Sequence, residues 1–264
     1  MATKWSELRI SAGSFDLNKW LRGGYEKDII TTLYGGAGSG KSNWCMLAAV
    51  SQAKKGKKVL FIDSEGGFSV ERVRQLVGEG DGGGVGSGGD GGVEDGGKEE
   101  TEKVLKNITL LNVHDFDEQK KAFNSISKYV SENFSLIIVD GMTMLYRLAM
   151  ADAKNDEIKL RGVNQELARQ LKILAVIARE KNIPVLITNQ TYQEFLSFED
   201  LKEGKKPQEF MVGGDLLKYW SKCIIELKNF NGKRKARIVK HRSLKEKELN
   251  FYINDLGVRR RGWI

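Results

Sequence analysis

The sequence predicts an α/β protein built on a mostly parallel, twisted sheet with helices on both faces and a C-terminal antiparallel extension. Three observations lead to this class. Short, continuously apolar segments alternate with longer amphipathic ones up to residue 220, as in parallel sheets covered on both faces. A glycine-rich loop joins the first strand to the first long helix. After residue 220 short strands follow one another with tight connections.

Length and composition fit one such domain, over residues 1–264. The chain is 40% hydrophobic and 30% charged, as expected of a globular protein that buries a core. No apolar run approaches the ~18 residues that a membrane-spanning helix needs, and residues 1–10 form no apolar signal segment. Cys45 and Cys223 lack metal-ligand spacing and are expected to be reduced thiols. We therefore expect a cytoplasmic protein without membrane contact.

The elements of the parallel core follow from their apolar patterns. The expected strands are 28–34, 57–63, 107–113, 135–140 and 183–189. The expected helices are 43–55, 117–134 and 157–182. Asp117 stands at the start of the second helix and is predicted to be its N-cap.

The C-terminal extension is predicted from three short strands, 222–228, 235–242 and 248–253. Asn231-Gly232 lies between the first two and indicates a tight hairpin. We expect these strands to form an antiparallel extension at the edge of the parallel sheet.

Residues 78–97 differ in composition from the rest of the chain. Twelve of the twenty residues are glycines and five are acidic, so the segment cannot bury enough apolar surface to offset the entropy of ordering it. We predict a disordered surface insertion, which the slow growth of loop-closure entropy with length makes tolerable. A functional acidic arm is the alternative.

Residues 35–42 read GGAGSGKS and fit the phosphate-binding pattern G-x-x-x-x-G-K-[ST] between a strand and a helix. Glycines let the backbone N–H groups surround phosphate oxygens, and the following helix N-terminus adds partial positive charge. Lys41, whose charge is expected on a solvent-facing loop, would reach the β- and γ-phosphates, and Ser42 would hold Mg²⁺. The predicted nucleotide-binding residues are Gly35, Gly36, Ala37, Gly38, Ser39, Gly40, Lys41, Ser42 and Asn43.

Polar residues at the ends of other strands predict the rest of a nucleotide site. Asp140 ends an apolar strand and is expected to bind Mg²⁺ directly or through water. Glu65 lies beyond another strand tip and is the candidate for orienting the attacking water, with a solvated loop acid as the alternative. Asp63 is closer to its strand and is predicted to be structural. Asn189 and Gln190 are amides at the carboxyl edge, where ligands bind; Gln190 would sense the γ-phosphate, unless both amides only cap a loop.

Together these motifs resemble the RecA/RadA recombinase superfamily. The resemblance spans nearly the whole chain, from ISAGSFDLNKWLRGGYEKDIITTLYGGAGSGKS through FIDSEGGFSVERV and IIVDGMTMLYR to GGDLLKYWSKCIIELK. It implies a RecA-like P-loop NTPase core that binds ATP and Mg²⁺. It also implies that Glu65 is the catalytic base and that Gln190 couples the γ-phosphate to a DNA-binding loop.

Departures from the superfamily pattern bear on the activity. RadA-type recombinases carry an N-terminal helix-hairpin-helix domain and a Phe-x-x-Ala polymerisation motif. Here the resemblance begins about ten residues from the start, and no Phe-x-x-Ala occurs. The chain and its RIVKHRSLKE tail resemble most the short archaeal paralogues of RadA. That resemblance implies a DNA-binding accessory factor with weak ATP hydrolysis.

Positive charge is concentrated where a polyanion would bind. The chain has a net charge of +8, and residues 228–264 hold twelve Lys/Arg against three Asp/Glu. The segment 191–212 follows Gln190 and corresponds to the DNA-binding loop of the superfamily; it is expected to be mobile. The residues expected to contact single-stranded DNA are Tyr192, Lys202, Lys205, Lys206, Lys233, Arg234 and Lys235. A mobile loop with aromatics tucked onto the core is the alternative for 191–212.

Lys240 and Arg242 alternate along one predicted strand and are expected to share a face, with His241 on the other. A lysine pair on the corresponding strand of bacterial RecA reaches the neighbouring subunit's nucleotide, so the resemblance implies a contact in trans if the chain self-associates. The alternative is contact with DNA phosphates.

The function expected from the sequence is an ATP-binding, DNA-binding accessory factor of homologous recombination and DNA repair with weak DNA-dependent ATPase activity. Its expected partners are single-stranded DNA, the RadA recombinase or other recombination proteins, and a second copy of the chain. Two alternatives remain: a filament-forming strand-exchange recombinase, and a KaiC-like signalling ATPase that does not act on DNA.

Overall fold

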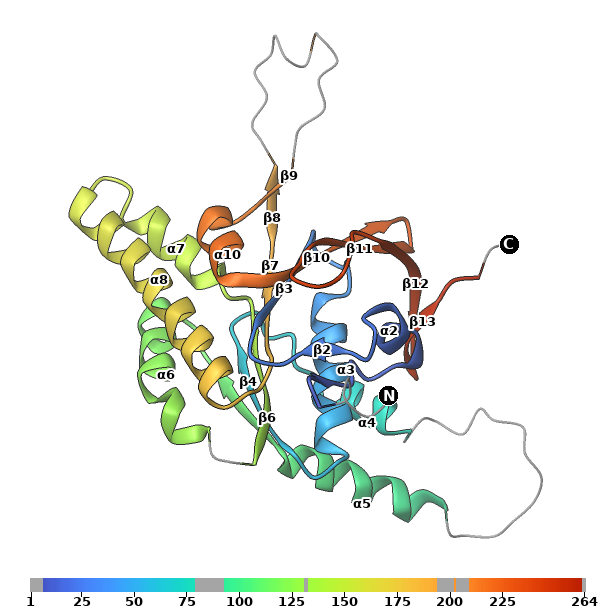
Figure 1. Ribbon diagram of the computed structural model, residues 1–264. Helices are drawn as coiled ribbons and strands as arrows, with labels where there is room; N and C mark the ends of the chain where they lie inside the picture. Colours follow the sequence, from blue (N-terminus) through green and yellow to red (C-terminus); the bar gives the residue numbers. More distant parts are fainter. Residues whose placement is uncertain (1–6, 79–92, 131–132, 194–201, 203–208, 263–264) are drawn as a thin grey trace.

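The computed structural model describes residues 7–78, 93–130, 133–193, 202 and 209–262. A nine-stranded sheet crosses the molecule with helices on both faces (Figure 1). Its strands are β3 (Ile30–Tyr34), β4 (Lys58–Asp63), β5 (Ile108–Asn112), β6 (Phe134–Asp140), β7 (Val185–Asn189), β10 (Ser221–Phe230), β11 (Lys233–His241), β12 (Glu248–Asn254) and β13 (Gly257–Arg260). They lie in the order β13-β12-β11-β10-β3-β7-β6-β4-β5.

The predicted class is confirmed, with one difference at β10. This strand was expected to open the antiparallel extension, but it pairs parallel to β3, with Ile225 opposite Leu33. The short helix α10 (Gly214–Trp220) precedes β10 directly, so the chain enters β10 level with Ile30, at the start of β3. Antiparallel pairing therefore begins only at β11.

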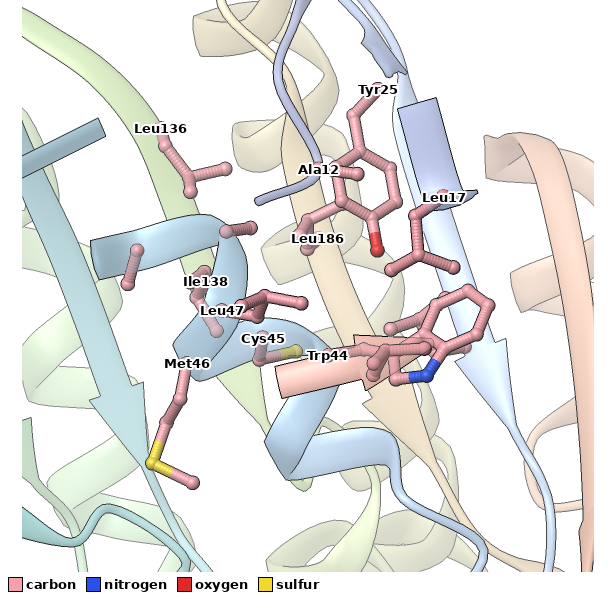
Figure 2. Packing of buried hydrophobic residues seen from close by; sticks show 14 of the residues in the cluster. Ala12, Leu17, Tyr25, Trp44, Cys45, Met46, Leu47, Leu136, Ile138 and Leu186 are labelled. Carbon is pink, nitrogen blue, oxygen red and sulfur yellow. The ribbon is translucent and has the colours of Figure 1, made fainter. Parts of the chain in front are cut away.

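Two apolar layers cover the sheet. One contains α2 (Phe15–Trp20), α3 (Lys41–Ala53), α4 (Val70–Val77) and α5 (Val93–Lys106), and the other α6 (Phe116–Tyr129), α7 (Met144–Asp152), α8 (Glu157–Glu180) and α10. Figure 2 shows the first layer around α3, where the buried Trp44 ring lies with its centroid 5.3 Å from that of Phe251 and 6.0 Å from that of Trp20. This contact fixes the C-terminal strands against the helix that follows the glycine-rich loop. None of the helices in the described part of the chain has the length and apolarity to cross a bilayer.

The N-cap of helix α6 lies two residues earlier than the sequence predicted. Its N-cap is Asp115, whose carboxylate accepts a hydrogen bond from the Glu118 N–H at 2.7 Å. Asp117, predicted as the cap, lies in the first turn and pairs with Lys120 at 2.8 Å. The buried Phe116 ring explains the difference, because its packing draws residue 116 into the helix.

The predicted insertion 78–97 is only partly within the described structure. Gly78 is the C-cap of α4, and α5 already begins at Val93. Residues 79–92 lie outside the described residues. The prediction of disorder was therefore wrong for 93–97, which are helical.

The Asn231-Gly232 hairpin is confirmed. Both residues have positive φ, 49° and 84°, which is the conformation that a type I′ turn requires and that few residue types adopt. The turn joins β10 to β11 with Phe230 opposite Lys233.

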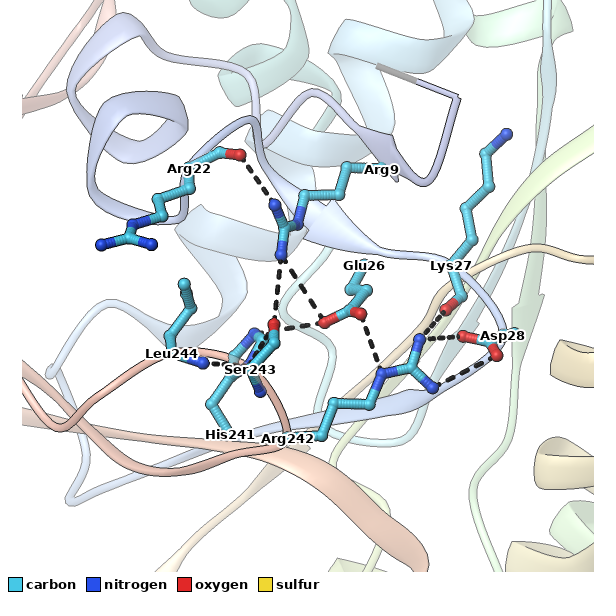
Figure 3. Close-up of polar contacts among 9 residues, drawn as sticks. All are labelled: Arg9, Arg22, Glu26, Lys27, Asp28, His241, Arg242, Ser243 and Leu244. Carbon is cyan, nitrogen blue, oxygen red and sulfur yellow. Dashed lines mark hydrogen bonds and ion pairs between the residues drawn. The ribbon is translucent and has the colours of Figure 1, made fainter. Parts of the chain in front are cut away.

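A polar cluster ties the N-terminal strands β1 (Arg9–Ile10) and β2 (Tyr25–Glu26) to the end of β11 (Figure 3). The Glu26 carboxylate lies 2.8 Å from Arg242 Nε and 3.5 Å from His241 Nε2. His241 Nδ1 accepts hydrogen bonds from the N–H groups of Ser243 and Leu244 at 3.0 and 3.1 Å. Because Nδ1 accepts these bonds it carries no proton, and the imidazole ring is neutral.

His241 should make the folded protein less stable as the pH is lowered. Burial lowers the pKa of this imidazole, although Glu26 opposes the shift. A lowered folded-state pKa means that the stabilising contribution is present above the unfolded value of about 6.5 and is lost as pH falls below it. We expect His241→Asn, which keeps a hydrogen-bond acceptor, to flatten the dependence of the thermal midpoint on pH between about 7 and 5. The exposed His114 is the matched control, and an equal effect of His114→Asn would contradict this assignment.

Candidate functional site

The glycine-rich loop follows β3 and leads into α3 as predicted. Gly35 has a φ of 155°, and a Cβ there would collide with the Leu227 carbonyl oxygen of β10. Gly40 is the N-cap residue of α3 and has a φ of 106°. The loop therefore combines a left-handed turn with the unpaired N–H groups of a helix N-terminus, an arrangement suited to anions.

Lys41 lies over this loop but is not solvent-facing, so that expectation was wrong. As the first residue of α3 it is only 6% exposed. Its ammonium donates to the carbonyl oxygens of Gly35 and Gly36 at 2.9 and 3.0 Å. Burial lowers the pKa of Lys41, and the carboxylates of Glu65 and Asp140 oppose that shift. The charge thus faces the interior of the loop.

Asp140 and Ser42 face the same small space. The buried Asp140 accepts a hydrogen bond from Thr188 Oγ1 at 2.5 Å through Oδ1, while Oδ2 has no hydrogen-bond partner among the described residues. A Cβ on Gly67 would lie 2.8 Å from that Oδ2 and 3.0 Å from Ser42 Oγ. Burial raises the pKa of Asp140, opposed by the hydroxyls of Thr188 and Ser42.

These two oxygens fit Mg²⁺. A hard cation would supply the partner that Asp140 Oδ2 lacks, and an adjacent hydroxyl is a ligand of the same class. The described residues contain no cluster of three or more His, Cys, Asp or Glu side chains that would form a complete cage. A site with few protein ligands is what Mg²⁺ uses when phosphate oxygens and water provide the others.

Glu65 and Gln190, 125 positions apart in sequence, meet beside this space. Gln190 Nε2 donates to Glu65 Oε2 at 3.1 Å. Asp63 is structural, as predicted, because its carboxylate accepts the N–H groups of Glu65, Gly67 and Phe68 at 2.9–3.2 Å. Glu65 itself stays exposed. The hydrogen bonds of Asp63 thus fix the backbone that carries Glu65, and the Glu65 side chain lies in contact with solvent.

Gln190 also opens a ribbon that projects from the sheet (Figure 1). Strands β8 (Thr191–Gln193) and β9 (Glu209–Met211) pair antiparallel. The buried Asn189 holds the base of the ribbon, accepting from Thr143 Oγ1 and donating to the Val212 carbonyl at 2.7 Å. Sequence reasoning missed Thr143 and Thr188, although a hydroxyl just before the end of an apolar strand was a usable signal for the latter.

The predicted DNA contacts are distributed over two regions. Within 191–212, Tyr192 and Phe210 stack with centroids 5.8 Å apart and are 45% and 40% exposed. The two ends of this predicted loop are therefore strands rather than mobile chain. Lys205 and Lys206 lie outside the described residues, and Lys202 is described alone between gaps.

The second region is the β10–β11 hairpin. Lys233 is exposed, and Lys235 pairs with Glu248 at 3.0 Å. Arg234 points to the opposite face of β11, toward the glycine-rich loop, with its Cδ 4.0 Å from the place of a Cβ on Gly40. All three cations line one cavity beside the hairpin, and Arg234 differs from the two lysines in lying next to the glycine-rich loop.

Lys240 and Arg242 do not share their surroundings, contrary to the predicted alternation. Lys240 Nζ donates to the Lys218 carbonyl at 2.5 Å, whereas Arg242 forms ion pairs with Glu26 and Asp28 (Figure 3). His241 and Arg242 both reach Glu26, because β11 ends at residue 241 and the alternation ends with it. Arg242 lies level with the start of β3, at the end of the sheet opposite to the glycine-rich loop.

Arg72 of α4 is a further polar residue at the loop that sequence reasoning missed. Its guanidinium donates to Asn43 Oδ1 at 2.9 Å and to the Asn254 carbonyl at 2.7 Å. It therefore joins the start of α3 to the β12–β13 turn. No local pattern in the sequence of α4 predicts the contact between Arg72 and Asn43.

Comparisons with known proteins agree with this geometry. The family model described as Rad51 matches residues 4–81 and 94–261, so the unmatched stretch falls within the glycine-rich segment. A protein of Methanococcus maripaludis (strain C7) named DNA repair and recombination protein RadB is 38% identical over 243 residues, 92% of this chain and 96% of its own. The protein of that name from Methanocaldococcus jannaschii is 36% identical over 92% of this chain and 98% of its own. A solved structure, described as the crystal structure of the RadB recombinase, superposes with a TM-score of 0.70 at 30% identity, covering 96% of this chain and all of the other.

Proposed function

The chain belongs to the Rad51 family, and from this premise we propose that it is an ATP-binding, DNA-binding accessory factor of homologous recombination and DNA repair, with weak DNA-dependent ATPase activity. The relatives that carry the name DNA repair and recombination protein RadB support the recombination role. We place it in the cytoplasm, with single-stranded DNA, the RadA recombinase and a second copy of the chain as partners.

One observation carries the proposal: the hydrogen bond between Gln190 and Glu65. It joins the candidate base to the first residue before the ribbon, so a change at the nucleotide alters a contact that the ribbon shares. Coupling of this kind is a difference in binding energy between two sites. The ribbon lies in the segment that corresponds to the DNA-binding loop of the superfamily. A nucleotide site without a contact to this ribbon would give no reason to propose DNA over other partners.

The roles in the nucleotide site follow from the geometry. Residues 35–43 would surround the phosphates. The Lys41 ammonium, which donates to the Gly35 and Gly36 carbonyl oxygens, would donate to phosphate oxygens instead when nucleotide is bound. Ser42 and Asp140 would hold Mg²⁺, which when bound neutralises phosphate charge. Glu65 would orient or deprotonate the attacking water while Gln190 positions Glu65. The exposure of Glu65 supports a weak activity, since water competes for the carboxylate.

The experiment that tests the proposal combines gel filtration with filter binding to single-stranded DNA, each with and without Mg·ATP. We expect small assemblies that bind DNA in an ATP-dependent manner. Long ATP-dependent filaments on DNA would instead support a strand-exchange recombinase. ATP-driven self-assembly without any DNA binding would support a KaiC-like signalling ATPase.

Lys240 and Arg242 should differ in their effect on DNA binding. We propose that Lys240 contacts DNA phosphate, whereas the charge of Arg242 is already paired with Glu26 and Asp28. Lys240→Ala should then reduce the slope of log affinity against log salt by about 0.7 on single-stranded DNA. Arg242→Ala should lower the thermal midpoint and leave the slope nearly unchanged.

The competing role is contact with a neighbouring subunit's nucleotide. In that case the Lys240→Ala, Arg242→Ala double variant would keep the salt slope of the wild type and lose only ATP-dependent assembly or hydrolysis. Filter binding at four or more salt concentrations, together with gel filtration in ATP, separates the two roles.

A further inference from the structure

The three consecutive cations at the start of β11 divide between two faces of the sheet. Along the strand, Arg234 shares its face with Ala236 and Ile238, which are fully buried against the α3 side. Lys235 faces the other way and pairs with Glu248. The residues that the sequence grouped as one basic surface therefore have different neighbours.

Arg234 continues this buried face to the glycine-rich loop. Gly40 lies beside Ile253, Phe251 and the Cδ of Arg234. Across the hairpin Arg234 is opposite Asn229, whose side-chain amide donates to the Gly38 carbonyl at 3.2 Å. Asn229 thus bonds to the loop, and the aliphatic stem of Arg234 lies beside it at Gly40.

The guanidinium of Arg234 is incompletely satisfied there. Its Nε is buried and has no hydrogen-bond partner among the described residues, and no carboxylate in that part of the chain pairs with it. A buried polar group without a partner is costly, and more so when it is charged. The planar fork of arginine matches phosphate oxygens, which accept two of its N–H groups at once.

We propose that Arg234 is a nucleotide-contacting residue, whose guanidinium binds a phosphate oxygen of the ATP or ADP held by the glycine-rich loop. The inference rests on the proposed ATP-binding function. The hairpin follows β10, on one side of β3, whereas Glu65 and Gln190 follow β4 and β7, on the other side. Since the γ-phosphate is assigned to the Glu65 side, Arg234 contacts a phosphate that ADP and ATP have in common.

The test measures Mg·ATP and Mg·ADP affinity by titration calorimetry for the wild type, Arg234→Met, Lys233→Met and Lys235→Met. Methionine keeps the stem that packs on Gly40 and removes the charge. We expect Arg234→Met to weaken both nucleotides about 10- to 100-fold, the loss of a charge-assisted hydrogen bond. Arg234→Lys should recover part of the loss. The two lysine variants should bind both nucleotides as the wild type does.

The outcomes separate this inference from the function on which it rests. A wild type that binds neither nucleotide overturns both. Wild-type binding with an unchanged Arg234→Met affinity overturns only the inference, and so does a loss confined to ATP. A reduced DNA salt slope in Arg234→Met with intact nucleotide affinity would return Arg234 to the DNA surface. Circular dichroism and the thermal midpoint check folding; if Arg234→Met does not fold, Arg234→Gln answers the same question.

Discussion

Replacing Lys41 by alanine should weaken Mg·ATP binding by about 10²- to 10⁴-fold. The ammonium faces the interior of the loop and already bonds the Gly35 and Gly36 carbonyls. With nucleotide bound it would form charge-assisted bonds to two phosphates, each contributing about 1.5–3 kcal/mol, and the sum corresponds to the expected range. The measurement is titration calorimetry with Mg·ATP.

Lys58→Ala is a matched control for Lys41→Ala. The Lys58 ammonium also donates to a backbone carbonyl, that of Lys106, at 2.7 Å, but this hydrogen bond lies on the surface. It should leave nucleotide affinity unchanged. Because Lys41 is buried, Lys41→Met is measured alongside to keep the packing of its stem. Wild-type affinity in a folded Lys41 variant would rule out the assignment of this loop to phosphate.

Replacing Glu65 by glutamine should keep ATP binding and lower the rate of ATP hydrolysis by about 10²- to 10⁴-fold, the usual effect of removing a general base. The substitution is isosteric, and the new amide can still bond Gln190. The loss should therefore appear in kcat at saturating ATP with little change in KM. A phosphate-release assay in the presence of single-stranded DNA measures it.

Glu71→Gln provides the control for Glu65→Gln. Glu71 is an exposed acid on the adjacent α4 and pairs only with Arg74 at 3.2 Å among the described residues. Its substitution should leave hydrolysis unchanged. An unchanged rate in Glu65→Gln would mean that Glu65 is a solvated loop acid and that no general base operates at this position.

The parallel core and the glycine-rich loop could be predicted from local sequence because their signals are local. Continuous apolar strands, the G-x-x-x-x-G-K-[ST] spacing and the strand-terminal Asp140 each depend on a few neighbouring residues. The direction of β10 could not be predicted in this way. It depends on α10 returning the chain to the start of β3, which no short pattern reports.

Several corrections share a physical cause: the packing or contact that decides the outcome comes from residues distant in sequence. Asp115 and Asp117 stand on either side of Phe116, and the burial of Phe116 selects Asp115 as the cap of α6. The run Lys233-Arg234-Lys235 reads as one basic patch until the position of Gly40 separates Arg234 from its neighbours. Strand alternation also failed for Arg242, because the strand ends one residue earlier and the exposed guanidinium pairs with Glu26.

The most direct test of the account is the affinity of a labelled single-stranded oligonucleotide, measured by fluorescence anisotropy with and without Mg·ATP, for the wild type and for Gln190→Ala. If Gln190 couples the nucleotide site to the β8–β9 ribbon, Mg·ATP should raise the wild-type affinity by at least about fivefold, the lower end of typical coupling energies. Gln190→Ala should still bind nucleotide but lose that increase. A wild type that does not bind the oligonucleotide, or binds it equally with and without Mg·ATP, would contradict the account.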